Sequence, residues 1–283
     1  MKNSRKIIQL YPQLQHDLDL EGLYLQADSD EQKPLVYTNF ITSMDGRIAI
    51  EHPVTGKRGV PEFITNPRDW RLYQELAARA DVLLVSARYL RELAKGEAQA
   101  GLPVSDEPAF QDLKAWRRQQ SMTAQPAVVI LSASLNLPLS QVCEELDRDV
   151  YVATGEQADT DTIEKIESSG AKVLYAGKGK QVEGQKLIEQ LNSKGYQQIY
   201  SIAGPGVLET LLRAGVLGRI YLTQVHRMIG GASYDTLFEG QMLMPPADFK
   251  LRVLYFDQRS GEECGQCFGI YDITNKKISN RIF

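Results

Sequence analysis

The sequence has 283 residues, of which 43% are hydrophobic and 24% charged, and a formal net charge of −4 at pH 7. This length suits one large domain or two small ones, and the slightly acidic balance excludes an overall attraction to nucleic acid or to an anionic membrane. No apolar run approaches the ~20 residues that cross a bilayer and the N-terminus lacks a signal-peptide pattern, so we expect a soluble, cytoplasmic protein with neither nucleic-acid nor membrane partners.

Residues 1–33 are interpreted as an N-terminal extension and linker, and residues 34–283 as the main domain. Six leucines between Leu10 and Leu25 give the extension some packing capacity. Their pattern does not indicate which part of the main domain the extension contacts. The polar, acidic segment from Gln26 to Lys33 is typical of a linker.

Strands and helices alternate along most of the main domain. Residues 36–44 predict a strand that Asp45 and Gly46 close with a turn. Asn66 can cap the next helix, and Pro67 suits its first position. The last strands have no long helix between them, which predicts antiparallel pairing at the end of a mainly parallel sheet. The other strands are expected at 82–85, 127–131, 149–153, 172–175, 199–202, 219–226, 249–256 and 267–273, and the helices from Ser86 and at 109–119, 161–168 and 184–193.

A glycine turn follows the strand at 199–202. Gly204, Pro205 and Gly206 break the strand, and apolar residues then recur at helical spacing until Gly215. A turn of this kind places backbone N–H groups and the positive end of a helix dipole at one point, which suits a phosphate. The pattern is incomplete, because Glu209 occupies the third glycine position of the dinucleotide-binding motif. An ordinary tight turn between strand and helix remains the alternative.

Small and hydroxylated residues follow several other strands. They include Thr42 and Ser43, the segment from Ser86 to Tyr89, and Ser132 with Ser134. Ligands of mainly parallel sheets bind beyond the carboxyl ends of the strands. We therefore expect these residues and the glycine turn to converge on a phosphate-bearing ligand.

The three cysteines, Cys143, Cys264 and Cys267, are too few for a disulfide framework and indicate a reducing compartment. The spacing of Cys264 and Cys267 is compatible with half a zinc site or with a redox pair. No suitable pair of histidines completes a zinc site, and Cys267 leads into a strand rather than the helix that a redox pair needs. We predict no metal and assign these two thiols no role.

Six segments, in this order, resemble a known family. They are NFITSMDGR at 39–47, FITNP at 63–67, ADVLLVS at 80–86, AGP at 203–205, LLRAG at 211–215 and IGG at 229–231. Their order and spacing are similar to those of the reductase domain of riboflavin biosynthesis, the RibD C-terminal family. The resemblance implies an α/β fold like that of dihydrofolate reductase, with a mixed sheet flanked by helices and antiparallel C-terminal strands.

The resemblance also implies an activity. The family uses NADPH to reduce the ribose of a phosphorylated substrate, a phosphoribosylaminopyrimidine, to a ribityl chain, and its members pair as homodimers through a sheet edge. Candidate cofactor-binding residues are Thr42, Phe63, Tyr89, Ser132, Gly204, Pro205, Gly206, Val207 and Leu208, with Arg88, Ser132 and Ser134 for the adenosine 2′-phosphate. Candidate substrate-binding residues are Asn39, Ser43 and Thr65.

Asn39 and Asp45 match the family pattern and are the candidate catalytic residues. For Asn39 the alternative is a strand residue that bonds only to the backbone. For Asp45 the alternative is a purely conformational role in the turn. The sequence leaves both alternatives open.

The chain departs from the family on the substrate side. The arginine that the family carries in its first helix is replaced by Ala77, and the acidic residue before the glycine turn is replaced by Ile202. The motifs that the family uses on the cofactor side are better preserved in this sequence than those on the substrate side. Two other functions therefore remain open, a reductase of the same fold with another substrate and a nucleotide-binding protein without turnover.

Overall fold

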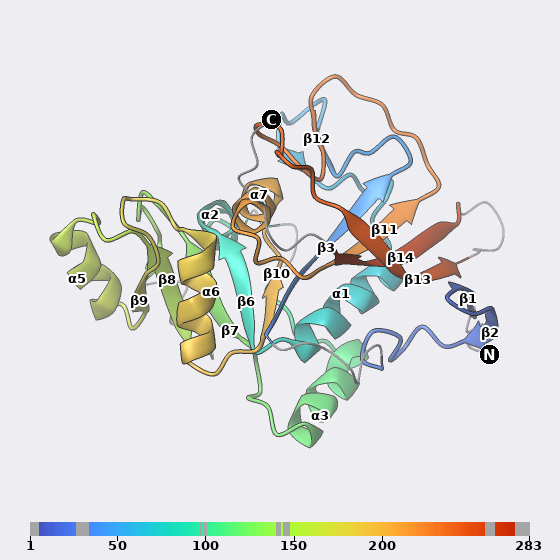
Figure 1. Ribbon diagram of the computed structural model, residues 1–283, viewed down its shortest axis with the longest axis horizontal. Helices are drawn as coiled ribbons and strands as arrows, with labels where there is room; N and C mark the ends of the chain where they lie inside the picture. The colour runs from blue at the N-terminus through green and yellow to red at the C-terminus, as the bar shows by residue number, and fades with distance from the viewer. Residues whose placement is uncertain are drawn as a thin grey trace.

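The computed structural model describes residues 6–26, 34–96, 98, 101–139, 143, 148–257 and 264–274. The described residues are organised around an 11-stranded sheet with the order β2-β1-β13-β14-β11-β3-β10-β6-β7-β8-β9 (Figure 1). A second sheet of three short strands, in the order β12-β4-β5, lies beyond one edge of this main sheet (Figure 1).

The middle of the main sheet is parallel, as the alternating pattern predicts. Except for the outermost of them, which is mostly exposed, its strands are nearly continuous runs of buried residues, which suits a sheet that is covered on both faces. They are β3 (Leu35–Ser43), β10 (Gln198–Ser201), β6 (Val82–Ser86), β7 (Ala127–Leu131), β8 (Val150–Thr154) and β9 (Lys172–Tyr175).

The C-terminal strands turn the sheet antiparallel, as predicted. Strand β11 (Arg219–Val225) still runs parallel to β3, whereas β14 (Gln266–Ile273) pairs antiparallel with both β11 and β13 (Phe249–Asp257). The small sheet is formed by β4 (Ala49–Glu51), β5 (Arg58–Gly59) and β12 (Tyr234–Asp235).

Helices cover both faces of the main sheet, and each buries an apolar stripe. On one face α1 (Pro67–Arg79) packs Leu72 and Leu76 against Tyr37, together with α2 (Ala87–Ala94), α3 (Gln111–Gln119) and α5 (Thr160–Ser168). A short 3-10 helix (Pro108–Phe110) precedes α3. On the other face α6 (Gly184–Ser193) and α7 (Pro205–Arg213) bury Leu187 and Leu208. Asn66 caps α1 as predicted, because its side chain accepts the N–H groups of Arg68 and Asp69.

The N-terminal residues extend the main sheet. Strand β1 (Ile7–Tyr11) pairs antiparallel with β13, and β2 (Gln15–Leu18) pairs with β1. The pattern of leucines did not predict these strands. Residues 27–33 of the expected linker lie outside the described residues. The division of the chain at residue 33 stays a prediction, although residues 6–26 clearly pack against the rest of the molecule.

A buried carboxylate holds this N-terminal segment. Glu75 in α1 is fully buried and accepts the backbone N–H groups of Gly22 at 2.6 Å and Tyr24 at 2.9 Å. Arg71 donates to the same carboxylate at 2.8 Å and also pairs with Asp112. Burial raises the pKa of Glu75, and these donors act in the opposite direction. The N-terminal segment is thus bonded to the interior of α1 as well as to β13.

Candidate active site

The predicted strand ends meet at one edge of the main sheet. Four hydrogen-bonded parallel neighbours, in the order β3, β10, β6 and β7, end at Ser43, Ser201, Ser86 and Leu131. Adjacent strands lie about 4.8 Å apart. The turn at Gly204, the start of α2 at Ser86 and the turn at Ser132 therefore lie side by side along this edge, as the sequence predicted.

The glycine turn leaves open space at the start of α7. Gly204 is the N-cap, and its carbonyl accepts the N–H groups of Val207 at 3.1 Å and Leu208 at 3.3 Å. The Gly206 N–H finds no acceptor among the described residues. A Cβ atom added to Gly204 or Gly206 would meet no heavy atom within 4 Å. An anion can approach this helix end closely, and Pro205 has no N–H to offer.

Leu208 differs from its neighbours in the turn. Its side chain is 2% exposed and belongs to the apolar core beneath α7. Val207 is half-buried, whereas Gly204 and Gly206 are exposed. Backbone groups of the turn, rather than the Leu208 side chain, face the open edge.

Asp45 connects the end of β3 to the loop after β11. Its carboxylate accepts the Ser43 hydroxyl at 2.5 Å and the Gly230 N–H at 2.8 Å, and it pairs with Arg47 at 2.9 Å. The Ser43 and Gly230 hydrogen bonds lower the pKa of Asp45 to about 2. An ionised group with these donors stabilises the loop and has no proton to give at neutral pH. The proposed direct catalytic role of Asp45 stays a prediction.

The depressed pKa of Asp45 predicts a pH-dependent contribution to stability. An unfolded aspartate has a pKa of ~3.9, so the ionised form stabilises the fold above about pH 4 and loses this effect as the pH falls towards 2. We expect Asp45→Asn to lower the urea midpoint at pH 6 and to differ less from wild type at pH 2.5. The exposed Asp161 in α5, changed to Asn, is the control. If the urea midpoints of wild type and Asp45→Asn differed equally at both pH values, the lowered pKa assigned to Asp45 would be contradicted.

Asn39 lies in the middle of β3 and bonds to a side chain rather than to the backbone. Its Oδ1 accepts the Tyr200 hydroxyl at 2.5 Å. Tyr200 is fully buried and stacks on Tyr37 with ring centroids 4.9 Å apart, and burial raises its pKa well above the ordinary value. The neutral phenol thus fixes the orientation of the Asn39 amide, whose Nδ2 has no acceptor among the described residues.

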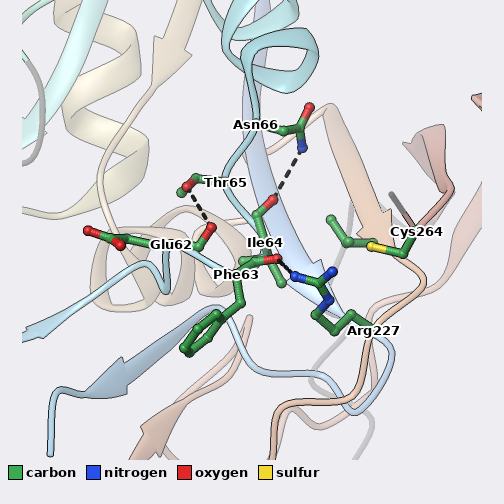
Figure 2. Close-up of a pocket in the computed structure, with 8 residues that line it drawn as sticks. Glu62, Phe63, Ile64, Thr65, Asn66, Arg227 and Cys264 are labelled. Atoms are coloured by element: carbon green, nitrogen blue, oxygen red, sulfur yellow. Dashed lines mark hydrogen bonds between the residues drawn. The ribbon is translucent and has the colours of Figure 1, made fainter. Parts of the chain in front are cut away.

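Thr42, Thr65 and Phe63 occupy different surroundings. Thr42 is 2% exposed, and its hydroxyl donates to the Ser43 carbonyl at 3.1 Å. Thr65 is exposed and donates to the Glu62 carbonyl at 3.1 Å. The Phe63 ring is 62% exposed and points away from Arg227 (Figure 2). Phe63 is therefore available to a flat ligand, whereas the hydroxyl of Thr42 is engaged in the backbone of the turn.

The candidates for the 2′-phosphate lie at the ends of β6 and β7. Arg88 is exposed, pairs with Glu92 at 2.7 Å and donates to the Arg58 carbonyl at 3.1 Å. Ser134 is exposed, while Ser132 is 4% exposed and its hydroxyl accepts the Leu135 N–H at 3.0 Å.

Tyr89 lies in the first turn of α2 beside these residues and is half-buried. Burial raises its pKa to about 12, so its phenol is neutral at physiological pH. The neighbouring strand ends thus present one guanidinium, one exposed hydroxyl and one neutral phenol.

A cavity of about 180 Å³ lies beside the end of β11 and was not predicted. Residues 62–66, Val225, Arg227 and Cys264 line it (Figure 2). The Arg227 guanidinium donates to the Phe63 carbonyl at 2.7 Å. The only sequence signal was that Arg227 lies two residues before the start of the IGG segment at 229–231. Cys264 and Cys267 are free thiols, and the described residues contain no group of three His, Cys, Asp or Glu side chains that could hold a metal.

Comparison with protein families adds the deciding observation. The family model described as the RibD C-terminal domain matches residues 34–258. The chain belongs to the RibD C-terminal domain family.

Relatives within and around this family are distant in sequence. A 2,5-diamino-6-ribosylamino-4(3H)-pyrimidinone 5′-phosphate reductase of Aquifex aeolicus is 22% identical over 211 residues, which cover 74% of this chain and 84% of that protein. A pyrimidine reductase-like protein of Corynebacterium diphtheriae is 20% identical with a TM-score of 0.62, covering 86% of this chain and 92% of that one. Acinetobacter baumannii RibD is 16% identical with a TM-score of 0.54, covering 86% and 58%. These likenesses confirm the predicted fold class.

The structure also shows what replaces the family's substrate-side charges. Ala77 is fully buried in the core beneath α1, and Ile202 is half-buried. Arg79, two residues further along α1, donates to the Tyr24 carbonyl at 2.9 Å and so binds the N-terminal segment. Neither replaced position carries a charge that could contact a substrate of this family.

No described helix is long and apolar enough to cross a membrane.

Proposed function

We propose that the protein is an NADPH-dependent reductase that converts the ribose of a phosphoribosylaminopyrimidine to a ribityl chain, as in riboflavin biosynthesis. The observation that carries this proposal is the open glycine turn at the start of α7, in a chain of the RibD C-terminal domain family. The Aquifex aeolicus relative, whose name specifies a ribosylaminopyrimidinone 5′-phosphate, supports the choice of substrate.

The residues at the sheet edge fit the cofactor. The Gly206 N–H and the positive end of α7 suit the pyrophosphate, and the space beside Gly204 and Gly206 admits it. Arg88 and Ser134 are exposed at neighbouring strand ends and would hold the adenosine 2′-phosphate. When bound, the nicotinamide supplies the hydride.

The chain's own residues act mainly by positioning. The Asn39 amide, held by Tyr200, would orient the substrate on the face of β3 that also carries Ser43. Asp45 keeps the loop at Ile229 and Gly230 against the end of β3. Holding donor and acceptor in one geometry is a major source of rate acceleration when the chemistry belongs to a cofactor.

Cofactor binding tests the first part of the proposal. Titration of the purified protein with NADPH should change the nucleotide fluorescence, and NADH should bind more weakly. Failure to bind either nucleotide would refute the proposal. Tight binding without turnover on any substrate would support a nucleotide-binding protein.

A second candidate, a reductase of the same fold with another substrate, is favoured by Ala77 and Ile202. The homodimer and the cytoplasmic location stay predictions.

Arg88 provides a test of nucleotide preference. We expect Arg88→Gln to weaken NADPH binding by about 10-fold, because a charge-assisted bond to the 2′-phosphate is lost. Binding of NADH, which lacks this phosphate, should not change. Arg118→Gln on the exposed side of α3 is the matched control, since α3 lies away from the sheet edge that carries the site (Figure 1). Equal weakening of both nucleotides would show that Arg88 does not contact the 2′-phosphate.

A further inference from the structure

We propose that Arg227 binds the phosphate group of the substrate in the cavity beside the end of β11. This inference rests on the proposed function, because it assigns a residue to the phosphorylated end of that substrate. It supplies a charge that the family's usual positions no longer provide in this chain.

The surroundings of Arg227 leave most of its donors available. The one hydrogen bond of its guanidinium within the described residues is to the Phe63 carbonyl at 2.7 Å, and no described carboxylate lies within ion-pair distance of it. Its side chain is half-buried and lines the cavity. Figure 2 shows the carboxylate of Glu62, the acidic residue in the lining, pointing away from Arg227. A guanidinium has five N–H donors in a planar fork that matches a phosphate.

The arginines of the nearby helix are already engaged. Arg68 pairs with the buried Asp257 at 2.7 Å, Arg71 pairs with Glu75 and Asp112, and Arg79 donates to the Tyr24 carbonyl. Each of these guanidinium groups therefore serves the structure of α1 and its contacts. Arg227 is the cation that the cavity itself presents.

The position of Arg227 relative to β3 also fits a substrate. In the parallel pairing of β11 with β3, Val225 lies opposite Ser43. Just beyond this pair, the Met44 N–H donates to the Arg227 carbonyl at 2.8 Å. The cavity is thus beside the strand end that carries Ser43, and residues 62–66 place it at the start of α1. It lies close enough for one extended substrate to contact both regions.

The size of the cavity selects one part of the substrate. A volume of about 180 Å³ holds a phosphate group and part of a sugar, and is smaller than the ~300 Å³ at which pockets for whole ligands begin. The Thr65 hydroxyl and the Asn66 side chain add polar groups to the lining. The pyrimidine would therefore lie outside the cavity, towards the open sheet edge.

Cys264 in the lining gives a direct assay of this cavity. Iodoacetamide labelling of the full chain is followed by mass spectrometry of the Cys264 peptide, with Cys143 as the internal reference. Ribose 5-phosphate should slow labelling of Cys264 by at least ~5-fold and leave Cys143 unchanged, while ribose should slow neither. In Arg227→Gln the protection should disappear, and in Arg227→Lys it should persist in part. Arg118→Gln should behave as wild type.

Kinetics provide the second readout. With the phosphoribosylaminopyrimidine as substrate, Arg227→Gln should raise KM by about 10- to 100-fold, with NADPH affinity and the melting temperature near those of wild type. Undiminished protection by ribose 5-phosphate in Arg227→Gln, or no protection in wild type, would overturn the inference. Protection that depends on Arg227 without oxidation of NADPH would instead refute the proposed function and leave the anion site standing.

Discussion

Replacing Gly206 with aspartate is expected to lower the affinity for NADPH by more than ~100-fold while leaving the fold intact. A side chain at this position enters open space, since no heavy atom lies within 4 Å of its Cβ. Aspartate near a helix N-terminus is itself favourable for the helix. The same carboxylate would occupy the space of the pyrophosphate and repel it, which accounts for ~3 kcal/mol or more of lost binding.

Two further variants make this prediction specific. Gly101→Asp adds the same charge at another glycine whose Cβ would meet no neighbour, and it should bind NADPH as wild type does. Gly206→Ala adds volume without charge and should have a smaller effect than Gly206→Asp. Fluorescence titration measures all three, and thermal melts check the fold. Unchanged NADPH binding in Gly206→Asp would place the cofactor elsewhere.

Replacing Glu75 with alanine is expected to destabilise the protein by ~3–5 kcal/mol, the usual result of breaking a buried ion pair. The change removes the acceptor of the Gly22 and Tyr24 N–H groups. It also removes one of the two carboxylates that pair with the buried Arg71 guanidinium, so that only Asp112 remains. Residues 6–26 lose both hydrogen bonds to Glu75 at the same time, and keep the bond from Arg79 to the Tyr24 carbonyl. The melting temperature should fall by roughly 6–15 °C for a domain of this size.

The control for this prediction is Glu167→Ala, which changes an exposed glutamate in α5 and should shift the melting temperature by little. Limited proteolysis adds a local readout, because cleavage within the N-terminal segment should become faster in Glu75→Ala only. A melting temperature within ~1 °C of wild type would show that the N-terminal segment is bonded to the domain in some other way.

Local patterns were sufficient to predict most of the parallel core. The apolar run at 36–44 became β3 (Leu35–Ser43), and the Asn66 and Pro67 signals marked the start of α1. Strands β1 and β2 escaped prediction because β1 pairs with β13, near the other end of the chain, and β2 pairs in turn with β1. Such strands are specified by a distant partner more than by their own composition.

In the candidate site, too, local features could be predicted from the sequence and long-range contacts could not. Strand ends could be located from the sequence, and the topology of parallel sheets brought them to one edge. The carboxylate of Asp45 instead contacts Gly230, and Arg227 contacts Phe63, across more than 160 positions of chain. No local pattern contains these contacts. The sequence therefore located the strand ends where we propose that the cofactor binds, but not the long-range contacts of Asp45 and Arg227.

The most direct test of the account is an assay of NADPH oxidation by the purified protein with 5-amino-6-(5-phosphoribosylamino)uracil as substrate. Absorbance of NADPH is followed together with mass spectrometry of the pyrimidine product. We predict one NADPH oxidised for each ribityl product formed, with NADH a poorer donor. Binding of NADPH without oxidation in the presence of this substrate would contradict the proposed reaction.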